Sequence, residues 1–149
     1  MVIRLAERDD VPTIVALLND DAVSRSRGVV DGTTDDHWAA FDAITEDPNN
    51  ELVVAELGGV IVGTMQLTYL PGLSRNGAWR LQVEAVRVAE AHRGKGLGRT
   101  MIDWAIERGR ARGCALVQLT SDKQRVDAHR FYVALGFAAS HEGFKLKLN

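Results

Sequence analysis

Apolar and polar residues along the first third of the chain predict a strand followed by two helices. Residues 2–6 have the alternation of a short strand. Asp9-Asp10-Val11-Pro12 then places acids and a proline where the first turn of a helix favours them, because the amides there lack partners. After a polar loop over residues 20–33, Thr34 is a good N-cap for a second helix with an apolar face.

The centre of the chain has the pattern of a hairpin, and the second half alternates strands with helices. The hairpin strands, residues 52–57 and 60–65, flank the turn dipeptide Gly58-Gly59. After a loop at 71–77 we expect, in chain order, a strand at 79–88, a helix from about 97 to 112, a strand at 115–120, a helix at 127–135 and a last strand at 144–148. Alternation places Leu81, Val83 and Ala85 on one face of the strand at 79–88, and Gln82, Glu84 and Val86 on the other. The pattern predicts one α+β domain over residues 1–149.

Composition narrows the classes of function. The 149 residues suffice for the core of one domain, and a net charge of −2 argues against a nucleic-acid binder. No apolar run approaches a membrane span, and the N-terminus reads as a strand instead of an export signal, so we expect a cytoplasmic protein without a membrane partner. The single cysteine, Cys114, leaves no internal disulfide and no cluster of metal ligands. No metal is predicted.

The most distinctive motif is the glycine-rich basic loop Arg93-Gly94-Lys95-Gly96-Leu97-Gly98-Arg99, which lies between a predicted strand and a predicted helix. Its alternate glycines remove side chains that would keep a ligand from the backbone. The first amides of the helix are unpaired and lie at the positive end of the helix dipole. Together with three basic side chains they form a site suited to a phosphate or pyrophosphate.

Two common phosphate-binding loops do not fit this spacing. A P-loop requires a glycine five residues before the Gly94-Lys95 pair and a hydroxyl residue after the lysine; neither is present, since Gly96 follows. A dinucleotide fingerprint requires its third glycine where Arg99 stands, and residues 89–92 separate the loop from the strand.

The spacing Arg-x-x-Gly-x-Gly over Arg93–Gly98 resembles the acetyl-CoA pyrophosphate motif of the GNAT superfamily of N-acetyltransferases. The order of predicted elements is also that of the superfamily, and residues 127–137 resemble its Ala-x-x-Phe-Tyr-x-x-x-Gly-Phe signature. The C-terminal part is, in addition, similar to aminoalkylphosphonate acetyltransferases. The resemblance implies a three-layer α+β fold, with a mixed, mostly antiparallel twisted sheet of about seven strands flanked by about four helices.

The resemblance also implies a donor and its binding residues. The donor would be acetyl-CoA, whose pantetheine arm would pair with the backbone of Val86 and Val88 like an added strand. The pyrophosphate would be held by the amides of the loop, namely Arg93, Gly94, Lys95, Gly96, Leu97, Gly98 and Arg99. Many members carry Asn three residues before the signature Ala; this chain has Arg125, which either reaches a phosphate or the acceptor, or is solvated.

Acetyl transfer to an amine needs proton transfers. Alkyl ammonium groups titrate near pH 10, so a general base or a water relay must remove a proton first. Glu84 is the candidate base, with a solvated or ion-paired glutamate as the alternative. Tyr132 of the Phe-Tyr signature is the candidate acid for the departing thiolate, although its helical spacing also suits a core residue. A backbone N–H on the distorted strand near Val88 could stabilise the carbonyl oxygen, and His129 is expected to be solvated or hydrogen-bonded.

The acceptor is less defined by the sequence. Asp20, Asp21, Asp35 and Asp36 flank the segment expected to cover the acceptor, which would suit a cationic amine, although acidic loops are usually just solvated. We expect direct transfer of the acetyl group to a primary amine of a small molecule. A protein or peptide acetyltransferase and a non-catalytic acyl-CoA sensor are the alternatives, and a homodimer is possible.

Overall fold

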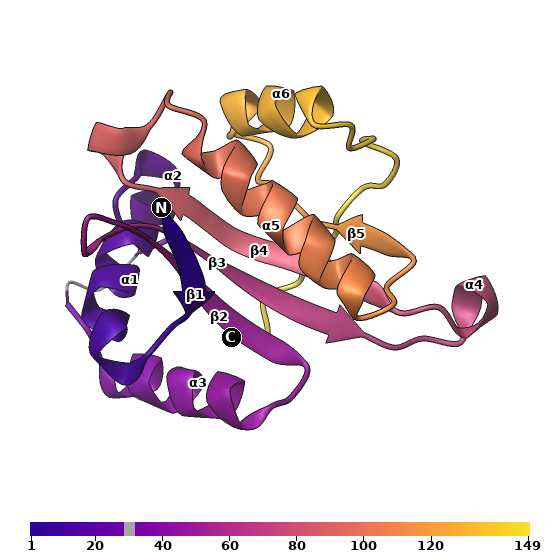
Figure 1. Ribbon diagram of the computed structural model, residues 1–149, viewed down its shortest axis with the longest axis horizontal. Helices are drawn as coiled ribbons and strands as arrows, with labels where there is room; N and C mark the ends of the chain where they lie inside the picture. The colour runs from indigo at the N-terminus through magenta and orange to yellow at the C-terminus, as the bar shows by residue number, and fades with distance from the viewer. Residues whose placement is uncertain (29–31) are drawn as a thin grey trace. The chain divides into compact units, whose positions relative to one another are not determined.

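A computed structural model describes residues 1–28 and 32–149 (Figure 1). It divides into two units, residues 1–119 (unit 1) and residues 120–149 (unit 2), each described by itself below. The expectation of a single domain over the whole chain therefore stays a prediction. No helix in the described ranges is long and apolar enough to cross a bilayer.

Unit 1 is built on one mixed sheet whose strands follow the chain order. The strands are β1 (Val2–Leu5), β2 (Asn50–Leu57), β3 (Val60–Leu70), β4 (Arg80–Val88) and β5 (Leu116–Gln118). The first four pair antiparallel and β5 pairs parallel with β4. The expected hairpin is confirmed: Gly58 and Gly59 both have positive φ, 59° and 80°, as the tight turn between β2 and β3 requires.

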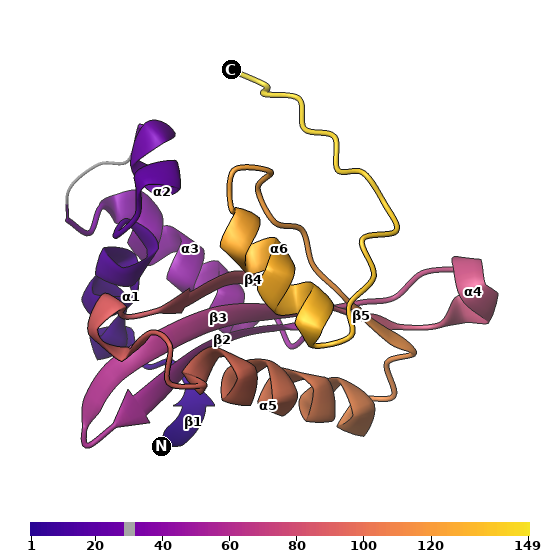
Figure 2. The ribbon, with the colours of Figure 1, turned by 90° about the horizontal axis from the view of Figure 1, so that it is seen from above.

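Five α-helices lie in the described part of unit 1, and the longer ones cover both faces of the sheet (Figure 2). They are α1 (Val11–Leu18), α2 (Ala22–Ser26), α3 (Asp35–Glu46), α4 (Ser74–Gly77) and α5 (Leu97–Ala111), with 3-10 turns η1 (Arg8–Asp10) and η2 (Glu90–His92). Thr34 caps α3 as expected, because its side chain accepts the His37 N–H while His37 Nδ1 accepts the Thr34 N–H at 2.9 Å. Figure 2 shows α1 and α3 on one face of the sheet and α5 on the other.

Two apolar layers hold these helices in place. On one face, Val11 and Val15 of α1 and Phe41 of α3 form a buried cluster. On the other face, Met101, Ile102 and Ala105 of α5 are fully buried, and Ile106 is half-buried. Gly109 brings α5 close to the sheet, since a Cβ added there would lie 3.0 Å from Leu81 Cδ2. This packing fixes α5, and so its N-terminal end, against β3 and β4.

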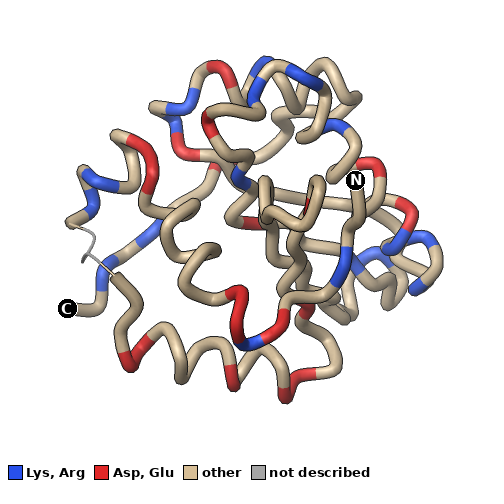
Figure 3. The backbone as a smooth tube through the Cα atoms, turned by 60° about the vertical axis from the view of Figure 1, so that its left-hand side comes forward, with Lys and Arg blue, Asp and Glu red and all other residues tan. Residues whose placement is uncertain are grey.

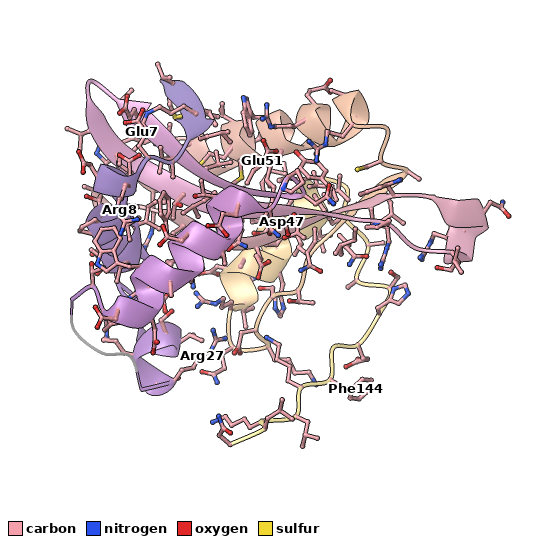
Figure 4. All side chains as sticks on the ribbon, turned by 90° about the horizontal axis from the view of Figure 1, so that it is seen from below. Glu7, Arg8, Arg27, Asp47, Glu51 and Phe144 are labelled. Atoms are coloured by element: carbon pink, nitrogen blue, oxygen red, sulfur yellow. The ribbon has the colours of Figure 1, made fainter. Side chains whose placement is uncertain are left out.

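Unit 2 contains one helix and an extended tail. Helix α6 (Val126–Ala134) ends just before Gly136, whose φ of 98° suits a helix terminator. The predicted strand at 144–148 is wrong, because the tail adopts no strand. Its apolar residues Phe144, Leu146 and Leu148 are 92%, 86% and 92% exposed (Phe144 is labelled in Figure 4). An alternating pattern specifies a strand only when a neighbour completes its hydrogen bonds.

The expected numbers of elements need correction. The described residues form one five-stranded sheet and six α-helices, where about seven strands and four helices were expected. The two additional helices, α2 and α4, are single short turns inside segments predicted as loops. Helices this short carry no amphipathic period, so hydrophobic spacing does not reveal them.

A partly buried polar network joins β2, β3 and α5. The Glu51 carboxylate accepts hydrogen bonds from the Tyr69 hydroxyl and from the Arg108 guanidinium, and Arg112 stacks on the Tyr69 ring at 3.9 Å. Burial opposes ionisation of Glu51, but the hydrogen bonds from Arg108 and Tyr69 outweigh it and hold the pKa of Glu51 below its usual value. Burial and the Glu51 contact raise the pKa of Tyr69, which therefore remains a donor.

Replacing Glu51 with glutamine is expected to lower the free energy of unfolding by about 1.5 kcal/mol at pH 7, because it weakens charge-assisted hydrogen bonds to Arg108, whose side chain remains 37% exposed to water. Since the pKa of Glu51 is lowered in the folded state, its stabilisation is present above its unfolded pKa of about 4.3 and is lost as pH falls through the folded value. Urea denaturation of the wild type and of Glu51→Gln between pH 3 and 7 measures the difference in their free energies of unfolding. A difference in stability that did not shrink at low pH would contradict it.

Candidate active site

The edge of β4 is open along most of its length. Strand β5 pairs with β4 only at Arg80–Gln82, so from Val83 onward β4 has β3 on one side and no strand of the sheet on the other. The Ala89 N–H donates to Val62 O of β3 at 2.8 Å. Because successive residues of a strand direct their backbone groups to opposite sides, the N–H and C=O of Val88 face the open edge. An extended ligand could pair there.

A β-bulge interrupts β4 within this open stretch. Gln66 of β3 is opposite Glu84, and Thr64 is opposite Arg87, so β4 has one extra residue between these pairs. Ala85 within the bulge has a φ of 53°, a left-handed conformation that is strained for a residue with a Cβ. The expected alternation fails here: Leu81 and Val83 are buried, but Ala85 is exposed, because the extra residue shifts the register.

The glycine-rich loop leads from this edge into the start of α5. Gly94 and Gly96 have φ of 75° and 81°, and no atom lies within 4 Å of a Cβ built on either. Gly96 is the N-cap of α5; it supplies no side-chain cap, and the first turn contains no acid. The first amides of α5 therefore remain available to an anion, next to the exposed side chains of Arg93 and Lys95.

Basic side chains border both the edge and the loop. Arg93 Nε donates to Val88 O at 3.0 Å, which links the loop to the carbonyl that faces the open edge. Arg87 Nη1 donates to Val86 O at 2.8 Å. Arg99 is exposed and lies 3.9 Å from Asp103, one helical turn further along. A ligand that pairs with this edge would share these carbonyls with the two arginines, since each carbonyl oxygen has two lone pairs.

Glu84 is the last residue of β4 before the bulge. Its side chain is exposed, and it has no hydrogen-bond or ion-pair partner in unit 1 as described, residues 1–28 and 32–119. A carboxylate in this position is accessible to a ligand at the bulge. The solvent-facing glutamate that we considered as an alternative has the same geometry.

The remaining candidates belong to unit 2. Tyr132 on α6 is half-buried and makes edge-to-face contacts with Phe131 and Phe137, with ring centroids 5.1 and 5.7 Å apart. Arg125 is the N-cap of the same helix and is partly buried. His129 Nε2 lies 2.9 Å from the carbonyl oxygen of Asp122, so the ring is hydrogen-bonded within unit 2.

The aspartates expected near the acceptor segment make different contacts in the structure. Asp21 caps α2 and lies 3.4 Å from Arg87, a residue that the sequence reasoning did not single out. Asp35 and Asp36 are exposed in the first turn of α3, where Figure 3 shows acidic residues and no basic ones along the helix. Within the described ranges, no group of three or more His, Cys, Asp or Glu could hold a metal.

The model of the acetyltransferase (GNAT) family matches residues 12–137, which include the bulged strand, the loop and α6. The chain belongs to the GNAT family. It is therefore an acyltransferase of the N-acetyltransferase type. In this chain the GNAT fold is built on the mixed sheet. Its bulged strand β4 leads through the glycine-rich loop into α5.

Known GNAT relatives include enzymes for small amines. The chain is 32% identical over 104 residues to an aminoalkylphosphonate N-acetyltransferase of Salmonella typhimurium, covering 70% of this chain and 67% of that one. It is 36% identical over 90 residues to a glucosamine 6-phosphate N-acetyltransferase of Trypanosoma brucei brucei, covering 60% and 59%. A solved structure described as a transcriptional regulator from Bacillus halodurans C-125 is 45% identical, with a TM-score of 0.92 and 99% of each chain covered.

Proposed function

We propose that this GNAT protein transfers the acetyl group of acetyl-CoA directly to a primary amine of a small molecule. The observation that carries the proposal is the continuous path from the open, bulged edge of β4 to the uncapped N-terminus of α5. An extended arm with a pyrophosphate at one end and a reactive group at the other matches such a path. Acetyl-CoA has this form and supplies an acetyl group activated as a thioester.

The residues present suit this donor. Amides of residues 93–99 would bind the pyrophosphate, and the positive φ of Gly94 and Gly96 keeps side chains away from it. Backbone groups of Val86 and Val88 would pair with the pantetheine arm. An amide at the bulge would donate to the acetyl carbonyl oxygen as it gains negative charge. Arg125 would contact a phosphate or the acceptor.

Two side chains would move protons. Glu84, exposed beside the bulge, would take a proton from the ammonium form of the acceptor, directly or through water. The Tyr132 hydroxyl would give a proton to the departing sulfur. Both curated relatives, named for an aminoalkylphosphonate and for glucosamine 6-phosphate, support a small amine that also carries an anionic group.

The direct test measures release of the CoA thiol from acetyl-CoA with a panel of amines, after calorimetry has established acetyl-CoA binding. The panel contains aminoalkylphosphonates, amino sugar phosphates, uncharged amines and lysine peptides. We expect turnover with small amines and none above background with peptides. Absence of acetyl-CoA binding would refute the donor, and preference for peptides would identify a protein acetyltransferase instead.

Replacing Glu84 with glutamine is expected to reduce turnover by about 100-fold near pH 7, within the range that general base catalysis contributes. The deficit should shrink as pH approaches 10, because the amine then loses its proton without help. The measurement is kcat for both proteins between pH 6 and 10 at saturating acetyl-CoA. Parallel pH profiles would exclude Glu84 as the base.

A non-catalytic acyl-CoA sensor is the second candidate, favoured by the 45% identical structure described as a transcriptional regulator. A sensor would bind acetyl-CoA without turning over any amine in the panel. Glu84→Gln and Tyr132→Phe would then leave acetyl-CoA affinity unchanged and have no activity to lose.

A further inference from the structure

Arg87, on the C-terminal side of the β4 bulge, connects the open edge of the sheet with helix α2. Its Nη1 donates to Val86 O at 2.8 Å, on the strand proposed to bind the donor. Its Nη2 lies 3.4 Å from Ser24 Oγ, and its Nε lies 3.4 Å from Asp21 Oδ2. Ser24 precedes Arg87 by 63 positions, so the guanidinium bridges two distant segments.

The same contacts anchor α2. Ser24 is the single buried residue of this five-residue helix. Asp21 is its N-cap: Oδ1 accepts the Ser24 N–H at 2.6 Å, while Oδ2 faces Arg87. A helix this short is unstable alone, so its position depends on such tertiary contacts. Removing Arg87 would therefore take a tertiary contact from both the cap residue and the buried serine.

The charges of this pair are largely withdrawn from water. The Arg87 and Asp21 side chains are only 16% and 19% exposed. A charge at such a position is poorly solvated, so loss of one partner weakens the compensation of the other. By contrast, Arg8 and Asp42 form an ion pair at 2.8 Å whose side chains are 57% and 54% exposed. Water solvates each of these charges when the other is removed, so the pair contributes little to stability.

We propose that Arg87 is a positioning residue, which holds α2 against the β4 bulge and thereby shapes the acceptor side of the site. The proposal rests on the proposed function, in which the amine attacks the acetyl group at the bulge. Asp21 then caps α2 and pairs with Arg87, and does not bind the ammonium group of the acceptor. The Arg87 guanidinium also contacts Val86 on the strand proposed to bind the donor, so one side chain links the donor and acceptor sides of the site.

The test compares Asp21→Asn, Arg87→Gln and the double variant in the full chain. Asp21→Asn is the cleaner single change, because it leaves the Val86 contact in place. We expect kcat/KM for the amine to fall about tenfold or more in each, since a misplacement of about 1 Å can cost about 100-fold. The Kd of acetyl-CoA should stay unchanged in Asp21→Asn, and the double variant should be no worse than Arg87→Gln.

Hydrogen exchange of the α2 amides, measured without substrates, gives a second readout. We expect faster exchange in residues 22–26 of both single variants, with the amides of α5 unaffected. The matched control is Arg8→Gln, which removes an arginine ion pair elsewhere in unit 1 and should change neither α2 exchange nor amine kinetics.

Two results would overturn the positioning role. One is unchanged exchange in α2 together with wild-type amine kinetics. The other is an equal loss for amine and acetyl-CoA that follows a lower free energy of unfolding, which would make the pair purely structural. Failure of the proposed function is separate: the wild type would then bind no acetyl-CoA or acetylate no amine, while the exchange experiment would still report on the bridge.

Discussion

Gly96→Ala is expected to weaken acetyl-CoA binding by about tenfold to 100-fold, equivalent to one lost charge-assisted hydrogen bond. Gly96 has a φ of 81°, which a side chain disfavours by about 1 kcal/mol, so alanine would pull the loop out of its conformation. The amides of residues 93–99, which we propose hold the pyrophosphate, would then change their relative positions. Isothermal titration calorimetry with acetyl-CoA measures the effect.

The chain offers a matched control in Gly113, just past the other end of α5. Its φ is 77°, and like Gly96 it has no atom within 4 Å of an added Cβ. Gly113→Ala should therefore cost a similar free energy of unfolding but leave the affinity for acetyl-CoA unchanged. If both variants lost affinity equally, the effect would come from the stability of α5 and not from an anion site at its N-terminus.

Tyr132→Phe is expected to lower kcat by about 100-fold while the Kd of acetyl-CoA changes little, because the hydroxyl would act only when sulfur departs. The ring contacts with Phe131 and Phe137 should survive, since phenylalanine keeps the same ring. Steady-state kinetics and calorimetry measure the two quantities. An unchanged kcat would make Tyr132 a packing residue of unit 2.

The other tyrosine of the chain provides the comparison. Tyr69 is buried and donates to the Glu51 carboxylate, so Tyr69→Phe should lower the free energy of unfolding by about 2 kcal/mol, the net value of a hydrogen bond to a charged group. Its kcat per folded molecule should remain that of the wild type. Equal losses of kcat in the two variants would show that the Tyr132 effect is not specific to a proton donor.

The local sequence determined the elements that have their own periodic or capping signals. The Gly58-Gly59 turn, the Thr34 cap and the helix that begins at Leu97 are all present as predicted. The position of the glycine-rich loop between β4 and α5 was predictable for the same reason, because it depends on adjacent residues at the start of one helix. These features require only the properties of a few neighbouring residues, such as a missing Cβ or a side-chain acceptor.

Features that depend on distant partners were decided by the tertiary structure. The β-bulge at Ala85 arises from pairing with β3, so the simple alternation of β4 failed to predict its exposure. The tail at 144–148 has a strand pattern but no ladder. Arg87 is one of several arginines in the sequence, and only folding brings Asp21 and Ser24 to it. The sequence shows which groups are able to interact. Which of them pair, and how deeply the pair is buried, is decided only when the chain folds.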